Sequence, residues 1–206
     1  MSASPKRCNS ALADSAASGT RYARSVSRAP PFRVWQEWTF ADGKAVRFEA
    51  ELYADDCPFA AENFRALCTG EMGNATTGSK PKLHYKGTVI HRIVSNYVAC
   101  AGDLETVNGA KNATSIYGKE FDDDSLKRTM NHAGAIAMVN RGPNTNGTQF
   151  FITLRDGLGE HLDGKNVCLG RVVTNLDALL AAVNAVGAGS DERPRSRITI
   201  TDCGEL

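Results

Sequence analysis

The sequence lacks the features of several protein classes. It contains no run of about 18 apolar residues, the minimum for a helix that crosses a membrane. It has no apolar segment of the kind found in a secretory signal. Its six cysteines include no Cys-x-x-Cys pair, and with four scattered histidines they do not form a zinc-binding pattern. We therefore expect no membrane association and no metal site, and we expect the cysteines to be buried, reduced thiols.

The motifs of the common catalytic and nucleotide-binding sites are also missing. The sequence has no GxSxG, no GxxxxGK[ST] and no HExxH. The consecutive acids Asp122, Asp123 and Asp124 are more typical of a solvated loop than of a metal site. We therefore expect neither an activated nucleophile nor a cofactor.

Charge is distributed unevenly along the 206 residues, although the net charge is only +1. Residues 1–33 contain six basic side chains and one acid, Asp14, which leaves 18 basic and 22 acidic side chains in the rest. The main part of the chain is therefore acidic, and we expect no nucleic-acid binding by bulk electrostatics.

Residues 1–33 are predicted to form a disordered basic arm. They are rich in Ser, Ala and Arg and show no hydrophobic period, so they bury too little apolar surface to order themselves. A basic, Ser-rich and acid-poor segment is also similar to a mitochondrial transit peptide. The expected location is the cytoplasm, with mitochondria as the alternative if this arm is a targeting segment.

Residues 34–206 are predicted to form one mainly β domain, a size typical of single domains. Two alternating apolar and polar runs flank Asp42 and Gly43, which predicts a β-hairpin over 34–53. Helices are predicted over 57–70 and 175–187. Further strands are predicted at 88–94, 97–101, 134–139, 148–154, 167–173 and 196–203. Eight strands and two helices favour an antiparallel barrel or a sandwich, and the pattern alone does not choose between them.

Two of the predicted strands carry polar side chains among apolar ones. In 88–94 the alternation places Arg92 on a half-apolar face, where an arginine can extend to solvent or pair with an acid. In 148–154 it places Gln149 and Phe151 on the face opposite Phe150. An amide beside an aromatic ring can bind an extended peptide, but it is also compatible with an ordinary mixed strand face.

Six segments, in the same order along the chain, resemble the cyclophilin family of peptidyl-prolyl cis–trans isomerases. They are AENFRALCTGE (61–71), YKGTVIHRI (85–93), SIYGKEFDDD (115–124), NRGPNTNGTQFFIT (140–153), LDGKNVCLGRV (162–172) and ITITDCGEL (198–206). The resemblance implies the family's closed eight-stranded antiparallel barrel capped by two helices. It also implies proline-containing polypeptides as partners, a monomeric state and cyclosporin binding.

The resemblance assigns Arg92 as the catalytic residue. Rotation about an X–Pro bond faces a barrier of about 18–20 kcal/mol because amide resonance must be broken. In the twisted state the proline nitrogen regains its lone pair, and a donor aimed at that nitrogen stabilises the transition state. By the same resemblance, Tyr97, Phe151 and Leu162 line the proline pocket, while Gln149 and the Asn140 backbone hold the peptide.

Several groove positions differ from the family pattern. The substituted positions are Tyr97 for Phe, Val98 for Met, Cys100 for Gln, Val139 and Arg141 for Ala, His161 for Trp, and Asn166 for His. A thiol is a weak hydrogen-bonding group, so Cys100 should leave Arg92 less well fixed than the family's Gln does. Val139 and Arg141 should crowd the peptide rim, which is a second route to slower turnover. His161 predicts weak cyclosporin binding.

Two functions remain open at this point. The first is a peptidyl-prolyl isomerase of reduced efficiency that acts in protein folding or conformational regulation. The second is a cyclophilin-fold module that binds proline-containing segments with little or no catalysis. The retained Arg92, Gln149 and Phe151 favour the first, and the lost Gln and His favour the second.

A loop at residues 73–84 resembles an insertion in the family's divergent members. In those members, cysteines matching Cys68 and Cys203 form a regulatory redox pair. The resemblance therefore predicts such a pair here, and the alternative is two independent buried thiols.

Overall fold

The computed structural model describes residues 32–76 and 79–206. The elements are β1 (Phe32–Phe40), β2 (Ala45–Leu52), α2 (Pro58–Thr69), β3 (Arg92–Val94), β4 (Val98–Ala101), β5 (Ala135–Met138), β6 (Phe150–Thr153), α3 (Gly159–Leu162), β7 (Cys168–Val172), α4 (Leu176–Val186) and β8 (Ile198–Glu205). β1 already includes Phe32 and Arg33, which the sequence analysis assigned to the N-terminal arm. The rest of that predicted arm lies outside the described residues.

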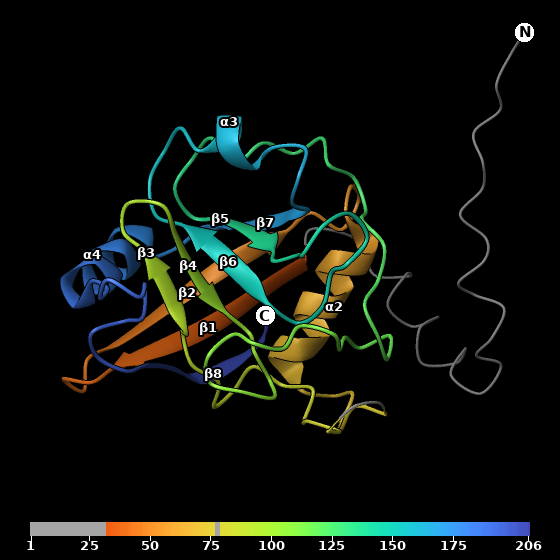
Figure 1. Cartoon of the computed structure of the whole chain (residues 1–206), viewed down its shortest axis with the longest axis horizontal. Helices are drawn as coiled ribbons and strands as arrows, with labels where there is room; N and C mark the ends of the chain where they lie inside the picture. The colour runs from red at the N-terminus through yellow and green to blue at the C-terminus, as the bar shows by residue number, and fades with distance from the viewer. Residues whose placement is uncertain (1–31, 77–78) are drawn as a thin grey trace, which may run out of the picture.

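The strands form one antiparallel sheet in the order β3-β4-β6-β5-β7-β2-β1-β8 (Figure 1). The prediction of a mainly β, eight-stranded antiparallel fold is confirmed. The hydrogen-bonded ladder is nevertheless an open half-barrel, and not the closed barrel that the resemblance implied. The strand expected over 88–94 begins only at Arg92, so most of it does not extend the ladder. The edges are joined by an isolated bridge between Val89 and Thr199.

Helices α2 and α4 lie at opposite ends of the sheet (Figure 1). Pro58 stands in the first turn of α2, and Gly70 ends the helix in the left-handed conformation at φ 71°. A β-carbon at Gly70 would also meet the His84 ring, 2.7 Å away. Asn175 precedes α4, but its side chain donates to the Arg47 carbonyl oxygen and does not cap the helix. The four-residue α3 was not predicted, because it is too short to show a helical period.

The alternating strands separate two apolar clusters. The main core lies on one face of the sheet and contains Trp38, Phe48, Phe64 and Phe150. The second cluster occupies the other face of β4, β5, β6 and β7, and consists of Val98, Cys100, Met130, Ala135, Ala137, Phe151, Leu158, Leu162 and Cys168. Of the groove residues predicted from the sequence, Val98, Cys100, Phe151 and Leu162 belong to this second cluster, and Tyr97 and Val139 pack against it.

A buried ionic cluster fastens α2 to β8. The guanidinium of Arg65 is 2.7 Å from Glu62, 2.6 Å from Glu71 and 2.9 Å from Glu205, and the Arg65 side chain is only 6% exposed. A buried charge is tolerated when it is paired and hydrogen-bonded, and the loss of a partner is therefore costly. No helix in the described part of the chain is long and apolar enough to cross a membrane.

Replacement of Arg65 by Ala should lower the free energy of unfolding by about 3–5 kcal/mol, because the mostly buried carboxylates of Glu62 and Glu205 lose their shared buried cation. Equilibrium unfolding in urea measures this change. Arg128→Ala is the matched control, since its ion pair with Asp56 is about half exposed and should contribute far less. Equal losses in the two variants would contradict this account.

Candidate functional site

Arg92, Cys100 and Phe151 lie side by side on three neighbouring strands. The register pairs Arg92 of β3 with Cys100 of β4, and Cys100 with Phe151 of β6. Residues directly opposite in a ladder place their side chains on the same face. The adjacent row of Ile93, Ala99 and Ile152 belongs to the main core, so the row that starts at Arg92 faces away from it.

Apolar side chains from several segments surround this row. Phe151, Val98 and Leu162 are buried in the second cluster, and the partly buried Tyr97 and Val139 pack against it. The Tyr97 and His161 rings stand 6.5 Å apart, edge to face, and His161 itself is exposed. The structure therefore brings the predicted pocket residues together around Phe151.

Gln149 is 3% exposed, and its side chain is tied to its own chain. Its Nε2 donates to the carbonyl oxygens of Gly109 (3.0 Å) and Lys111 (2.8 Å). The Gln149 amide therefore holds the 109–111 loop, and only its Oε1 is left to accept a hydrogen bond from a peptide. This refines the expected role of Gln149.

Asn112 is a structural residue of the site that the sequence analysis missed. Its side chain donates to the Val139 carbonyl oxygen at 2.8 Å and accepts from the Gln149 backbone N–H at 2.8 Å. It thereby joins the loop to both sides of the groove. Nothing in the local sequence pattern distinguishes Asn112 from the other loop asparagines.

Asn140 and Asn166 connect the two segments that flank the groove. Asn140 Nδ2 donates to the Lys165 carbonyl oxygen (2.7 Å), and Asn166 Nδ2 donates to the Met138 carbonyl oxygen (3.0 Å). These bonds use the side chains, so the Asn140 backbone groups remain available to a bound chain. Arg141 at the rim forms an ion pair with Glu120.

Arg92 has a partner that the sequence did not reveal. Its side chain is about half exposed, and Nε and Nη2 lie 2.6 Å and 2.5 Å from Oε2 of Glu192. This contact gives the arginine a partner besides Cys100, and how well Arg92 is fixed beside that thiol stays a prediction. One hundred residues separate the two side chains, so no local motif could have paired them.

Cys100 itself is an inert thiol. Burial raises its pKa to about 12, which outweighs the lowering by Arg92, and the carboxylate of Glu192 raises it further. The thiol therefore stays protonated near neutral pH and is a poor nucleophile. Because both charges act on this thiol, the Arg92–Glu192 pair lies close to Cys100.

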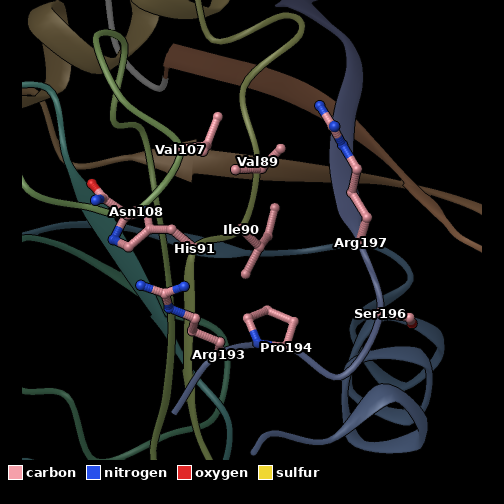
Figure 2. Close-up of a pocket in the computed structure, with 9 residues that line it drawn as sticks. All are labelled: Val89, Ile90, His91, Val107, Asn108, Arg193, Pro194, Ser196 and Arg197. Carbon is pink, nitrogen blue, oxygen red and sulfur yellow. The ribbon is translucent and has the colours of Figure 1, made fainter. Parts of the chain in front are cut away.

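A pocket of about 270 Å³ lies between residues 89–91, residues 107–108 and the segment before β8 (Figure 2). It is lined by Val89, Ile90, His91, Val107, Asn108, Arg193, Pro194, Ser196 and Arg197. None of the predicted groove residues lines it, although His91 and Arg193 are the chain neighbours of Arg92 and Glu192. Burial lowers the pKa of His91, so its ring is neutral at pH 7.

Cys68 and Cys203 are close to each other. Both are buried, free thiols, and their side chains are within hydrogen-bonding distance. Gln36 Nε2 also donates to Cys68 Sγ at 3.6 Å. Burial raises the pKa of Cys68 well above its usual value, and Cys203 adds to that shift.

Comparison with known proteins gives consistent matches. Residues 39–205 match the family model described as cyclophilin type peptidyl-prolyl cis-trans isomerase/CLD. The chain is 44% identical over 166 residues to "Peptidyl-prolyl cis-trans isomerase cyp11" of Rhizopus delemar, covering 80% of this chain and 48% of that protein. It is also 44% identical over 166 residues to "Peptidyl-prolyl cis-trans isomerase CYP21-1" of Arabidopsis thaliana, covering 80% and 71%. The chain thus spans about half the length of the Rhizopus relative.

Proposed function

Because the chain belongs to the cyclophilin family, we propose that it binds X–Pro segments of polypeptides and accelerates rotation about the prolyl amide bond. The observation that carries this proposal is the row of Arg92, Cys100 and Phe151 on the face opposite the main core. It places a permanent cation beside the apolar cluster that contains Phe151, and we place the proposed proline-binding depression over that ring.

The chemistry required is modest and matches this arrangement. A proline ring enters the depression beside Phe151 and Leu162, where apolar contact replaces water. The guanidinium of Arg92 stays charged at any physiological pH and donates toward the proline nitrogen as the amide twists. This interaction strengthens only in the twisted state, so it lowers the barrier without tightening ground-state binding equally.

Peptide backbone is held by groups along the groove. The hydrogen bond from Asn140 to the Lys165 carbonyl oxygen uses the Asn140 side chain, so the Asn140 backbone groups can bind the peptide. Gln149 contributes its Oε1 as an acceptor, because its Nε2 is already committed to the loop. A peptide N–H facing Gln149 is therefore part of the proposed binding mode.

Closure of the half-barrel into the family's barrel is a further part of the proposal. Besides the Val89–Thr199 bridge, Ile90 N–H donates to the Ile198 carbonyl oxygen at 3.1 Å and Ile200 N–H donates to the Thr88 carbonyl oxygen at 2.9 Å. These contacts support closure between the segment before β3 and β8.

Turnover is proposed to be lower than in family members with an open rim. Val139 narrows one side of the peptide path, and Arg141 is held at the other by Glu120. A longer peptide must displace or pass these side chains, whereas a short one need not.

The proposed setting is protein folding or conformational regulation by a monomer, in the cytoplasm, or in mitochondria if residues 1–33 direct it there.

A proline-peptide binding module with little turnover is the second candidate. It is favoured by the Arg92–Glu192 ion pair, because a guanidinium engaged by a carboxylate has fewer donors for a substrate. Measurement of isomerisation together with peptide binding distinguishes the two functions.

Arg92→Ala should reduce kcat/KM for a short X–Pro peptide on the order of 10²-fold, the usual cost of removing one donor that acts on the transition state. A protease-coupled or NMR exchange assay measures the rate. Arg47→Ala on β2 is the control, since Arg47 stacks on Trp35 and is remote from the groove. Wild-type protein without isomerase activity that still binds the peptide would establish the second candidate instead.

Cyclosporin should bind more weakly than it binds family members that carry Trp at this position. In family members with Trp, the indole N–H donates a hydrogen bond to the drug. The imidazole ring of His161 is smaller, and its nitrogens lie at different positions from the indole nitrogen. Isothermal titration calorimetry of the wild type and His161→Trp should show tighter binding by the variant. Nanomolar affinity of the wild type would refute this prediction.

In a Cys203→Ser variant, the reaction of Cys68 with glutathione disulfide should be slow at neutral pH and should keep accelerating above pH 9. The attacking species is the thiolate, and a raised pKa moves its appearance to higher pH than for an ordinary thiol of pKa about 8.5. Mass spectrometry of the protein treated with glutathione disulfide between pH 7 and 10 measures this rate. The double variant Cys68→Ser/Cys203→Ser is the control, and a rate that levels off near pH 8 would contradict the raised pKa of Cys68.

A further inference from the structure

The ion pair between Arg92 and Glu192 has a geometry that defines the orientation of the guanidinium. Two different nitrogens of one guanidinium, Nε and Nη2, converge on the same carboxylate oxygen at 2.6 Å and 2.5 Å. This arrangement fixes the plane of the guanidinium as well as its distance. A single contact through a terminal nitrogen would leave that plane free to rotate.

The backbone of Glu192 is fastened next to the arginine. Its carbonyl oxygen accepts the N–H of Ile93, the residue after Arg92, at 2.8 Å, and its own N–H donates to Gly189 at 3.1 Å. Glu192 has a φ of 61°, in the left-handed region that residues with a β-carbon rarely adopt. The loop therefore holds a carboxylate against β3 in a conformation that glycine would adopt without strain.

The strand partner of Arg92 offers no comparable acceptor. Cys100 lies directly opposite Arg92 in the ladder, but its thiol is buried, protonated and a weak hydrogen-bonding group. Within residues 32–76 and 79–206, Glu192 is the only side chain recorded as accepting a hydrogen bond from the Arg92 guanidinium.

We propose that Glu192 is the positioning residue of this groove, and that it orients Arg92 in place of the amide that Cys100 has replaced. The inference rests on the isomerase function proposed above. A guanidinium has five N–H donors, and Oε2 engages the Nε–H and one Nη2–H. The Nη1 side of the fork remains for the proline nitrogen, so the carboxylate orients the catalytic donor and does not consume it.

This assignment changes the expected effect of restoring the amide. With Glu192 present, Arg92 is already oriented, so the gain in kcat/KM from Cys100→Gln should be smaller than the gain that the same substitution gives in the Glu192→Gly background. With Glu192 removed, the Gln side chain becomes the remaining orienting partner. The two positions should therefore be strongly coupled, as neighbours that share one partner are.

The kinetic test is a double-mutant cycle on the full chain with a short X–Pro peptide. Glu192→Gly removes the carboxylate and suits the left-handed backbone, and it should reduce kcat about tenfold with little change in KM. In the Cys100→Gln background the same substitution should cost no more than about twofold. Glu192→Gln, which keeps a neutral acceptor, should fall between wild type and Glu192→Gly.

Asp191→Gly is the matched control. Asp191 is the acid adjacent in the chain and pairs with Arg193 at 3.5 Å, away from Arg92. It should leave kcat within about twofold of wild type, which separates loss of the Arg92 contact from general loosening of the loop. Thermal melting of each variant verifies that the fold is retained.

A second readout does not depend on activity. The ¹⁵Nε–¹Hε NMR signal of Arg92 should show slow hydrogen exchange in the wild type and fast exchange in Glu192→Gly, with no change in Asp191→Gly. If the wild type is not an isomerase, the proposed function fails and this signal alone decides the role of Glu192.

Three results would overturn the inference. One is a faster enzyme on removal of Glu192, which would mean that the carboxylate withholds Arg92 from the substrate. Another is an equal loss in the wild-type and Cys100→Gln backgrounds, because it would show no shared partner. The third is an Arg92 Nε–H that exchanges as fast in the wild type as in Glu192→Gly.

Discussion

The pleat of the antiparallel sheet is the constraint on which the molecule depends. Successive side chains alternate between faces, so each of β4, β5 and β6 must supply both the main core and the groove. Phe150 and Ile152 fill the core, while Phe151 between them belongs to the second cluster, on the face of the proposed groove. A shift of one residue in the register would exchange these sets, and this couples the stability of the core to the position of Arg92.

Polar side chains in the groove are mainly used to hold the protein together. Gln149 and Asn112 tie the 109–112 loop to β6 and Val139, and Asn140 and Asn166 join the two flanking segments. Each of these groups would carry a desolvation cost if it were left unpaired. These hydrogen bonds therefore fasten the segments around the proposed peptide groove to one another.

The sequence was informative wherever a period or a turn decides the structure. The Asp42-Gly43 hairpin, the glycine that ends α2 and the alternation around Phe151 all follow from local backbone rules, and the structure agrees. Local backbone rules could not predict the short α3 or the late start of β3, because tertiary contacts determine where these elements begin and end. Glu192 was also missed, since its contact with Arg92 spans one hundred residues and requires an unusual backbone conformation.

The pairing of β1 with β8 has a consequence for how the chain acquires its structure. Thr39 and Thr201 are hydrogen-bonded across the two strands although 162 positions separate them. On a ribosome, β1 emerges long before β8, so one of its edges stays without a partner during most of synthesis. Such sequence-distant pairings slow folding, and an unpaired strand edge is prone to join other chains. A protein proposed to speed the folding of others would thus itself be vulnerable to aggregation until its β8 segment is made.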